Sequence, residues 1–112
     1  LLATEGTLKT KIYEKIFKKN FVLIKPLSNL QTGSVNKAIK HVKMGNIKLA
    51  EKTIKPAIKY LIKQKCKKII LGCTEIPIAI FAYKSLQNAK VSKLYLDPNL
   101  ILANSCMARY KK

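Results

Sequence analysis

The stretch KKIILGCT at residues 67–74 decides the fold prediction, because an apolar run rich in isoleucine stops abruptly at Gly72, Cys73 and Thr74. A short apolar run closed by turn residues is typical of a buried strand. A strand that only fills a core needs no thiol at its end. The pattern therefore marks Cys73 as a candidate reactive residue, although a small buried hydrophobe at a strand end explains it equally well.

Apolar runs and amphipathic segments alternate along the rest of the chain. Four apolar runs predict strands, at 1–4, 21–25, 67–74 and 93–97. Apolar residues at helical spacing predict helices over 7–19, 34–45, 47–65, 75–87 and 98–112. Because parallel neighbours need helical crossovers, this order predicts an α/β fold, a doubly wound three-layer sandwich with a parallel sheet of about four strands.

Several residues predict where these helices begin and end. Gly45 is expected to end one helix, and Asn46 to cap the next. Asp97 is expected to cap the last helix, followed by a proline in its first turn. Pro56 lies inside the segment 47–65, where it is expected to kink or divide the helix because proline removes a backbone donor.

Polar residues gather where the expected strands end. Thr4, Glu5, Gly6 and Thr7 follow the first strand, Gly72 to Glu75 the third, and Asp97 the fourth. Ligands of parallel sheets bind beyond these carboxyl ends, so one cleft is expected to collect the three groups. At the start of a helix, Cys73 is expected to meet free backbone amides, which together with nearby lysines favour thiolate over thiol. Cys73 is thus a candidate nucleophile or base.

Composition limits the classes of protein and of site. The 112 residues fit one domain, the hydrophobic content of 48% argues against disorder, and no apolar run is long enough for a membrane helix. The chain opens without methionine or a signal peptide, which suggests a fragment. Three cysteines and one histidine show no metal-ligand spacing. They predict no metal site and a reducing, cytoplasmic compartment.

The net charge of +18 first suggests a nucleic-acid partner. All basic residues except Arg109 are lysine, however, whereas base and phosphate recognition favours arginine. The lysines also spread along the whole chain, and several lie on one side of the helix predicted over 47–65. We expect a solvated surface and no specific nucleic-acid binding; a basic nucleic-acid binder stays as a minor alternative.

Four motifs resemble the aspartate/glutamate racemase family, specifically the C-terminal half of its aspartate racemase branch. They are LLATEGTLKTKIYEK at 1–15, HVKMGN at 41–46, LGCTEIP at 71–77 and YLDPNLILA at 95–103. The resemblance covers nearly the whole chain and keeps the motifs in order. It implies one lobe of a two-lobe α/β racemase, with residues 1–92 as the C-terminal lobe and 93–112 as a closing strand and helix that pack back toward the first lobe.

The resemblance also implies the chemistry. Members interconvert L- and D-amino acids without a cofactor, using two cysteines as acid and base on opposite faces of the α-carbon. Cys73 matches the second-lobe cysteine, Lys43 the lysine that contacts a substrate carboxylate, and Thr74 a donor to the α-carboxylate. Thr7 would line the same cleft, and Glu75 would organise its loop. Partners implied are aspartate or glutamate and, in the full-length protein, a second copy.

The first lobe of the family, with its Cys-Asn-Thr motif, has no counterpart in residues 1–112. The chain alone is therefore expected to be inactive. Apolar residues of the closing segment are expected to be exposed, namely Leu94, Leu96, Leu100, Ile101 and Leu102. The alternative function is a non-catalytic binding or assembly module derived from a racemase lobe.

Overall fold

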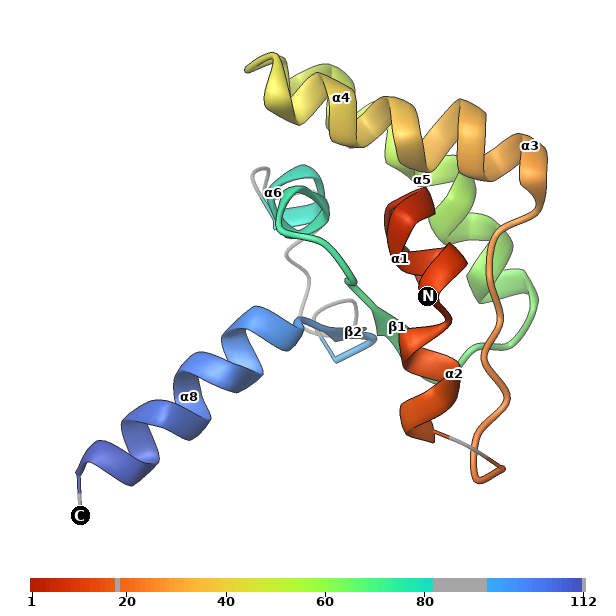
Figure 1. The fold of residues 1–112 in the computed structure, drawn as a ribbon. Coiled ribbons are helices and arrows are strands. Elements are labelled where there is room, and N and C mark those ends of the chain that lie inside the picture. Colours follow the sequence, from red (N-terminus) through yellow and green to blue (C-terminus); the bar gives the residue numbers. More distant parts are fainter. Residues whose placement is uncertain (18, 82–92, 112) are drawn as a thin grey trace.

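The computed structural model describes residues 1–17, 19–81 and 93–111. A small parallel sheet lies at its centre, formed by β1 (Ile69–Ile70) and β2 (Tyr95–Leu96) (Figure 1). The N-terminal residues lie along the other edge of β1, where Leu2 forms an isolated parallel bridge with Leu71. The prediction of a mixed α/β fold with parallel strands is confirmed.

The sheet is smaller than predicted. The described residues form two strands and one bridge rather than about four strands. The run at 21–25 is not a strand, although the Leu1 ammonium group donates a hydrogen bond of 2.7 Å to the Ile24 carbonyl. Its Phe21 and Val22 side chains are 66% and 90% exposed. Ile24 packs against the core, but the first two residues of the run are left uncovered and gain little from strand formation, which explains the difference.

Helices lie on both faces of the sheet. One face meets α4 (Lys37–Lys43), α5 (Ile47–Lys63) and α6 (Glu75–Phe81), which pack against one another. Their buried apolar side chains form one core with alternate sheet residues: Leu2, Val35, Ala38, Ile39, Ala50, Ile54, Ala57, Ile58, Leu61, Ile69, Leu71, Ile76, Ala79, Ile80 and Tyr95. The helix predicted over 75–87 is α6 as far as Phe81, and its remainder lies outside the described residues.

The opposite face carries α2 (Ile12–Phe17) and α8 (Pro98–Tyr110). A cavity of about 350 Å³ remains between these helices and the sheet, lined mainly by the apolar side chains of Tyr13, Phe17, Ile70, Leu96, Ile101 and Leu102. Figure 1 shows α8 extending away from the rest of the molecule. Leu100, Ile101 and Leu102 are exposed as predicted, whereas Leu94 and Leu96 are half-buried.

The expected first helix is divided into α1 (Glu5–Thr10) and α2. Lys11 separates them in the left-handed conformation, with φ of 52°, and its N–H donates to the Leu8 carbonyl. The stripe that predicted one helix includes Ile12 and Ile16, which are 49% and 65% exposed. Because that stripe does not face the core, packing does not favour a continuous helix.

The helix predicted over 34–45 begins earlier than expected. It starts as α3 (Ser28–Leu30), passes through one π-helical segment, η1 (Gln31–Asn36), and continues as α4. Gly45 follows with φ of 79°, which confirms the predicted end of the helix. The predicted caps are also confirmed, since the Asn46 side chain accepts a hydrogen bond from the Leu49 N–H and Asp97 accepts one from the Asn99 N–H.

Pro56 neither ends nor divides α5, which runs unbroken from Ile47 to Lys63. The buried Ser34 hydroxyl of η1 donates to the Thr53 carbonyl at 2.5 Å and accepts from the Ala57 N–H at 3.2 Å. The hydroxyl thus bridges the Thr53 carbonyl and the Ala57 N–H, one residue beyond the missing proline donor. This contact between segments could not be read from α5 alone.

Gly72 allows close approach of β1 to residues 1–3. A Cβ atom at this position would lie 3.0 Å from Leu1 Cδ1, 3.1 Å from Ala3 Cβ and 3.1 Å from the Leu2 carbonyl oxygen. We expect Gly72→Ala to lower the free energy of unfolding by about 1–3 kcal/mol, because the two segments would be forced apart. Guanidinium titration measures this loss.

Gly33 in η1 provides a matched control for this substitution. A Cβ atom there meets nothing within 4 Å. Gly33→Ala should therefore leave the free energy of unfolding unchanged or raise it by up to about 1 kcal/mol, through reduced backbone entropy. Equal effects at the two glycines would contradict the packing explanation.

Candidate functional site

The central feature of the site is the meeting of two chain segments at one edge of the sheet. Leu2 pairs with Leu71 in parallel. Thr4 lies two residues after Leu2 and Cys73 two residues after Leu71, so the two side chains are level with each other. The Gly72 N–H donates a hydrogen bond of 2.7 Å to the Leu2 carbonyl and keeps the segments together. The expected gathering of these strand ends is therefore present for the first and third segments.

Cys73 lies half-buried just before α6. Burial raises the pKa of its thiol above the usual range, and the charge of Glu75 and a side-chain hydrogen bond to it act in the same direction. Hydrogen bonds from the backbone N–H groups of Ile76 and Glu75 lower the pKa but do not compensate. The prediction that the helix start favours thiolate was wrong in this state, because desolvation outweighs the amide donors.

Glu75 holds the polar groups of this turn together. Its carboxylate accepts a hydrogen bond of 2.9 Å from the Thr74 hydroxyl and another from the Cys73 thiol. Burial alone would raise the pKa of Glu75, but these hydrogen bonds, its own N–H and the nearby charge of Lys43 lower it overall. The structure thus places Thr74 and Glu75 beside Cys73, with a neutral thiol next to an ionised carboxylate on which the charge of Lys43 acts.

Thr7 belongs to the first turn of α1 and contacts Thr4. Its N–H donates to the Thr4 Oγ1 atom at 3.2 Å, and the Thr4 hydroxyl donates to the Thr7 Oγ1 atom at 3.1 Å. Thr4 is therefore the N-cap of this short helix. Thr7 supports the turn that Thr4 occupies, and it is Thr4 whose side chain lines the neighbouring cavity.

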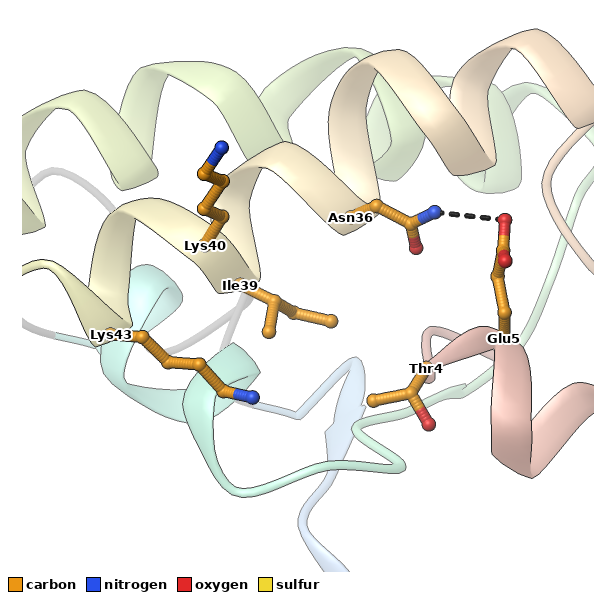
Figure 2. A pocket seen from close by; sticks show the side chains of 6 residues that line it. All are labelled: Thr4, Glu5, Asn36, Ile39, Lys40 and Lys43. Atoms are coloured by element: carbon orange, nitrogen blue, oxygen red, sulfur yellow. Dashed lines mark hydrogen bonds between the residues drawn. The ribbon is translucent and has the colours of Figure 1, made fainter.

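That cavity of about 360 Å³ lies between the Thr4 turn and α4 (Figure 2). Its described lining residues are Thr4, Glu5, Asn36, Ile39, Lys40 and Lys43. Lys43 extends toward Thr4, whereas Lys40 points away from it (Figure 2). Lys43 thus connects the cavity with the Cys73–Glu75 turn, because its charge also acts on Glu75.

Three residues near the site had no role in the sequence prediction. Tyr13 of α2 lies near Cys73: burial is the main cause that raises the pKa of Tyr13, and the charge of Cys73 contributes. Gln31 and Asn36 of η1 are joined by a side-chain hydrogen bond of 2.8 Å. They are five residues apart, a spacing that matches the turn of a π-helix and not the α-helical spacing used for the prediction.

The other two cysteines lie elsewhere. Cys66 comes just before β1, at the amino end of that strand, and Cys106 is exposed on α8. Neither shares the edge of the sheet where Cys73 lies. Within residues 1–17, 19–81 and 93–111, no group of three or more histidine, cysteine or acidic side chains is arranged to hold a metal ion. None of the helices in these ranges has the length and apolar character needed to cross a membrane.

Comparison with known families decides the classification. The family model described as Asp/Glu/hydantoin racemase matches residues 1–106. The chain belongs to this family. No solved structure shows a significant match to it. The match supports the racemase class of isomerases for this chain.

The raised pKa of Cys73 gives a direct prediction for this racemase domain. In a Cys66→Ser/Cys106→Ser background, alkylation of Cys73 by iodoacetamide should rise with pH at a higher midpoint in the folded chain than in urea. The thiolate is the reactive form, and folding disfavours it here. Glu75→Gln should move the folded midpoint downward, because it removes a negative charge and a carboxylate hydrogen bond. A folded midpoint below the unfolded one would contradict this assignment.

Proposed function

We propose that this chain is the C-terminal lobe of an aspartate or glutamate racemase, which inverts the α-carbon by cofactor-independent acid/base proton transfer. The observation that carries the proposal is the position of Cys73 at the edge of the sheet, level with Thr4 and hydrogen-bonded to Glu75. Acid/base inversion needs a proton-transferring group within hydrogen-bonding reach of the substrate, with donors for the negative charge that develops.

Each site residue has a role in this proposal. Cys73 transfers the proton on one face of the substrate α-carbon. Its thiol is neutral beside the ionised Glu75, so Cys73 starts as the acid, and Glu75 orients the thiol and organises its loop through the hydrogen bond between them. Lys43 binds a substrate carboxylate, Thr74 donates to the α-carboxylate, and Thr7 supports the turn of Thr4.

Proton transfer on the opposite face needs a second group. Cys66 and Cys106 do not lie at this edge, so we propose that a first lobe supplies the second cysteine and that the chain alone is inactive. In this scheme residues 1–92 form the second lobe, and 93–112 pack toward the first. We also propose a cytoplasmic homodimer for the full-length protein.

The test measures exchange of the substrate α-proton with deuterium in heavy water. It uses the complete gene product that contains residues 1–112, without added pyridoxal phosphate. L-aspartate, L-glutamate and a 5-substituted hydantoin are compared by proton NMR, with chiral chromatography for the opposite enantiomer. We expect exchange and inversion of an acidic amino acid, and none by residues 1–112 alone.

Two results would overturn this proposal. Inversion of the hydantoin without either amino acid would reject the substrate class. Binding of aspartate with no α-proton exchange would favour the alternative, a non-catalytic binding module derived from a racemase lobe.

A further inference from the structure

The cavity between α1 and α4 has one anionic and one cationic side. Glu5 lies on one side and Lys43 extends from the other, with Thr4 and Ile39 between them (Figure 2). A small molecule that carries both an ammonium and a carboxylate group would complement this arrangement, whereas a dicarboxylate without an ammonium group would not.

Glu5 is held in place by a chain of hydrogen bonds. The Gln31 Nε2 atom donates to the Ala3 carbonyl at 2.9 Å and to the Asn36 Oδ1 atom at 2.8 Å. The Asn36 Nδ2 atom then donates to the Glu5 Oε1 atom at 3.0 Å. Because the Ala3 carbonyl and the Glu5 carboxylate can only accept, both amides have one orientation in which every bond can form.

This support leaves the negative charge of Glu5 without a cation partner among the described residues. Their two ion pairs join Lys25 to Glu14 and Lys55 to Glu51. The neutral Asn36 amide fixes one carboxylate oxygen of Glu5, and the second oxygen is free to accept from a ligand. In a chain with 23 basic residues, a carboxylate that lines a cavity and pairs with no described lysine is available to a cationic ligand.

We propose that Glu5 binds the ammonium group of the amino-acid substrate, while Asn36 and Gln31 are positioning residues that hold the Glu5 carboxylate in the cavity. This proposal rests on the proposed function, because it concerns the same site. Thr4 is level with Cys73 across the paired segments, so a ligand held between Glu5 and Lys43 lies next to the turn that carries the thiol.

The test compares L-aspartate with succinate, which lacks the ammonium group but keeps both carboxylates. Affinities are measured by NMR titration of the complete gene product at two salt concentrations. Succinate carries one more net negative charge, so the overall positive charge of the chain favours succinate. A preference for aspartate therefore reports a local contact with the ammonium group.

We expect the wild type to prefer aspartate to succinate. Glu5→Gln should weaken aspartate binding about fivefold, which corresponds to the interaction free energy of an exposed charge pair. Succinate binding should not weaken, because the glutamine side chain still accepts the Asn36 hydrogen bond. Glu14→Gln is the matched control, since it makes the same charge change in the neighbouring helix beside Lys25. It should leave the ratio of the two affinities unchanged.

Asn36→Leu tests the positioning role, because it removes the hydrogen bond to Glu5 without changing charge. The ratio of aspartate to succinate affinity should fall, by less than in Glu5→Gln, whereas a purely structural role would weaken both ligands alike.

The proposal is overturned if Glu5→Gln changes both affinities by the same factor or leaves the affinity for aspartate intact. It is also overturned if the wild type does not bind aspartate. Inversion of aspartate that is insensitive to Glu5→Gln would reject Glu5 and keep the racemase. A Glu5-dependent preference for aspartate without α-proton exchange would keep the ammonium site and reject the racemase.

Discussion

Replacing Cys73 with alanine should strongly slow inversion of aspartate while binding of aspartate stays nearly unchanged. Among the described residues at this edge of the sheet, the Cys73 thiol is placed to give a proton to the α-carbon and take it back, whereas the Glu75 carboxylate is held by Thr74 and by the thiol itself. Loss of a positioned acid or base lowers the rate by about 10²–10⁴-fold. Chiral chromatography of the opposite enantiomer and NMR titration of aspartate measure the two properties separately.

Cys66→Ala and Cys106→Ala are the matched controls for this experiment. Cys66 packs beside the core before β1 and Cys106 is exposed on α8, so neither reaches the substrate. Both variants should keep wild-type inversion rates. Retention of wild-type inversion in Cys73→Ala, or loss of inversion in either control, would show that the proton-transferring group has been misassigned.

Gln31→Glu should lower the free energy of unfolding by about 3 kcal/mol at neutral pH, because it introduces a buried charge opposite two acceptors. The Gln31 side chain is 6% exposed and donates to the Ala3 carbonyl and to Asn36 Oδ1. A carboxylate can make neither bond as a donor. Its folded-state pKa should be raised, so stability should recover at acidic pH and be lost as the pH rises.

Gln64→Glu is the control, because Gln64 is exposed at the C-cap of α5. Gln64→Glu should lower the free energy of unfolding by less than about 1 kcal/mol, the size of an unfavourable interaction between a carboxylate and the helix dipole. Urea titrations of both variants at acidic and neutral pH check the expectation. A loss of equal size in the two variants would mean that the hydrogen-bond chain from Ala3 to Glu5 does not stabilise the fold.

Local signals in the sequence predicted much of the fold. The apolar stripe of α5, the end of a helix at Gly45 and the caps Asn46 and Asp97 each depend on residues within one or two turns of each other. The placement of Cys73 at the end of a buried strand also followed from one short run of residues. Such features survive in the structure because local preference and tertiary packing agree.

Features that depend on contacts between distant segments could not be predicted in this way. The π-helical turn of η1 places Gln31 against Ala3 and Ser34 against α5, and neither contact has a local sequence signal. The prediction of a thiolate at Cys73 was wrong for a similar reason, since desolvation depends on which residues pack around the thiol. The run at 21–25 had strand composition, but only its later part packs on the core and Phe21 and Val22 stay exposed.

The Ser34 contact has a consequence for how this chain acquires its structure. Pro56 weakens α5 in isolation, and the hydroxyl that compensates for it comes from η1, 19 and 23 residues before its two partners in α5. The hydrogen bonding of α5, which contributes five of the buried core residues, is therefore complete only when η1 has docked on it. Folding of the two elements should be concerted, so that amide hydrogens around Ala57 exchange with solvent together with those of η1 in a single cooperative unit.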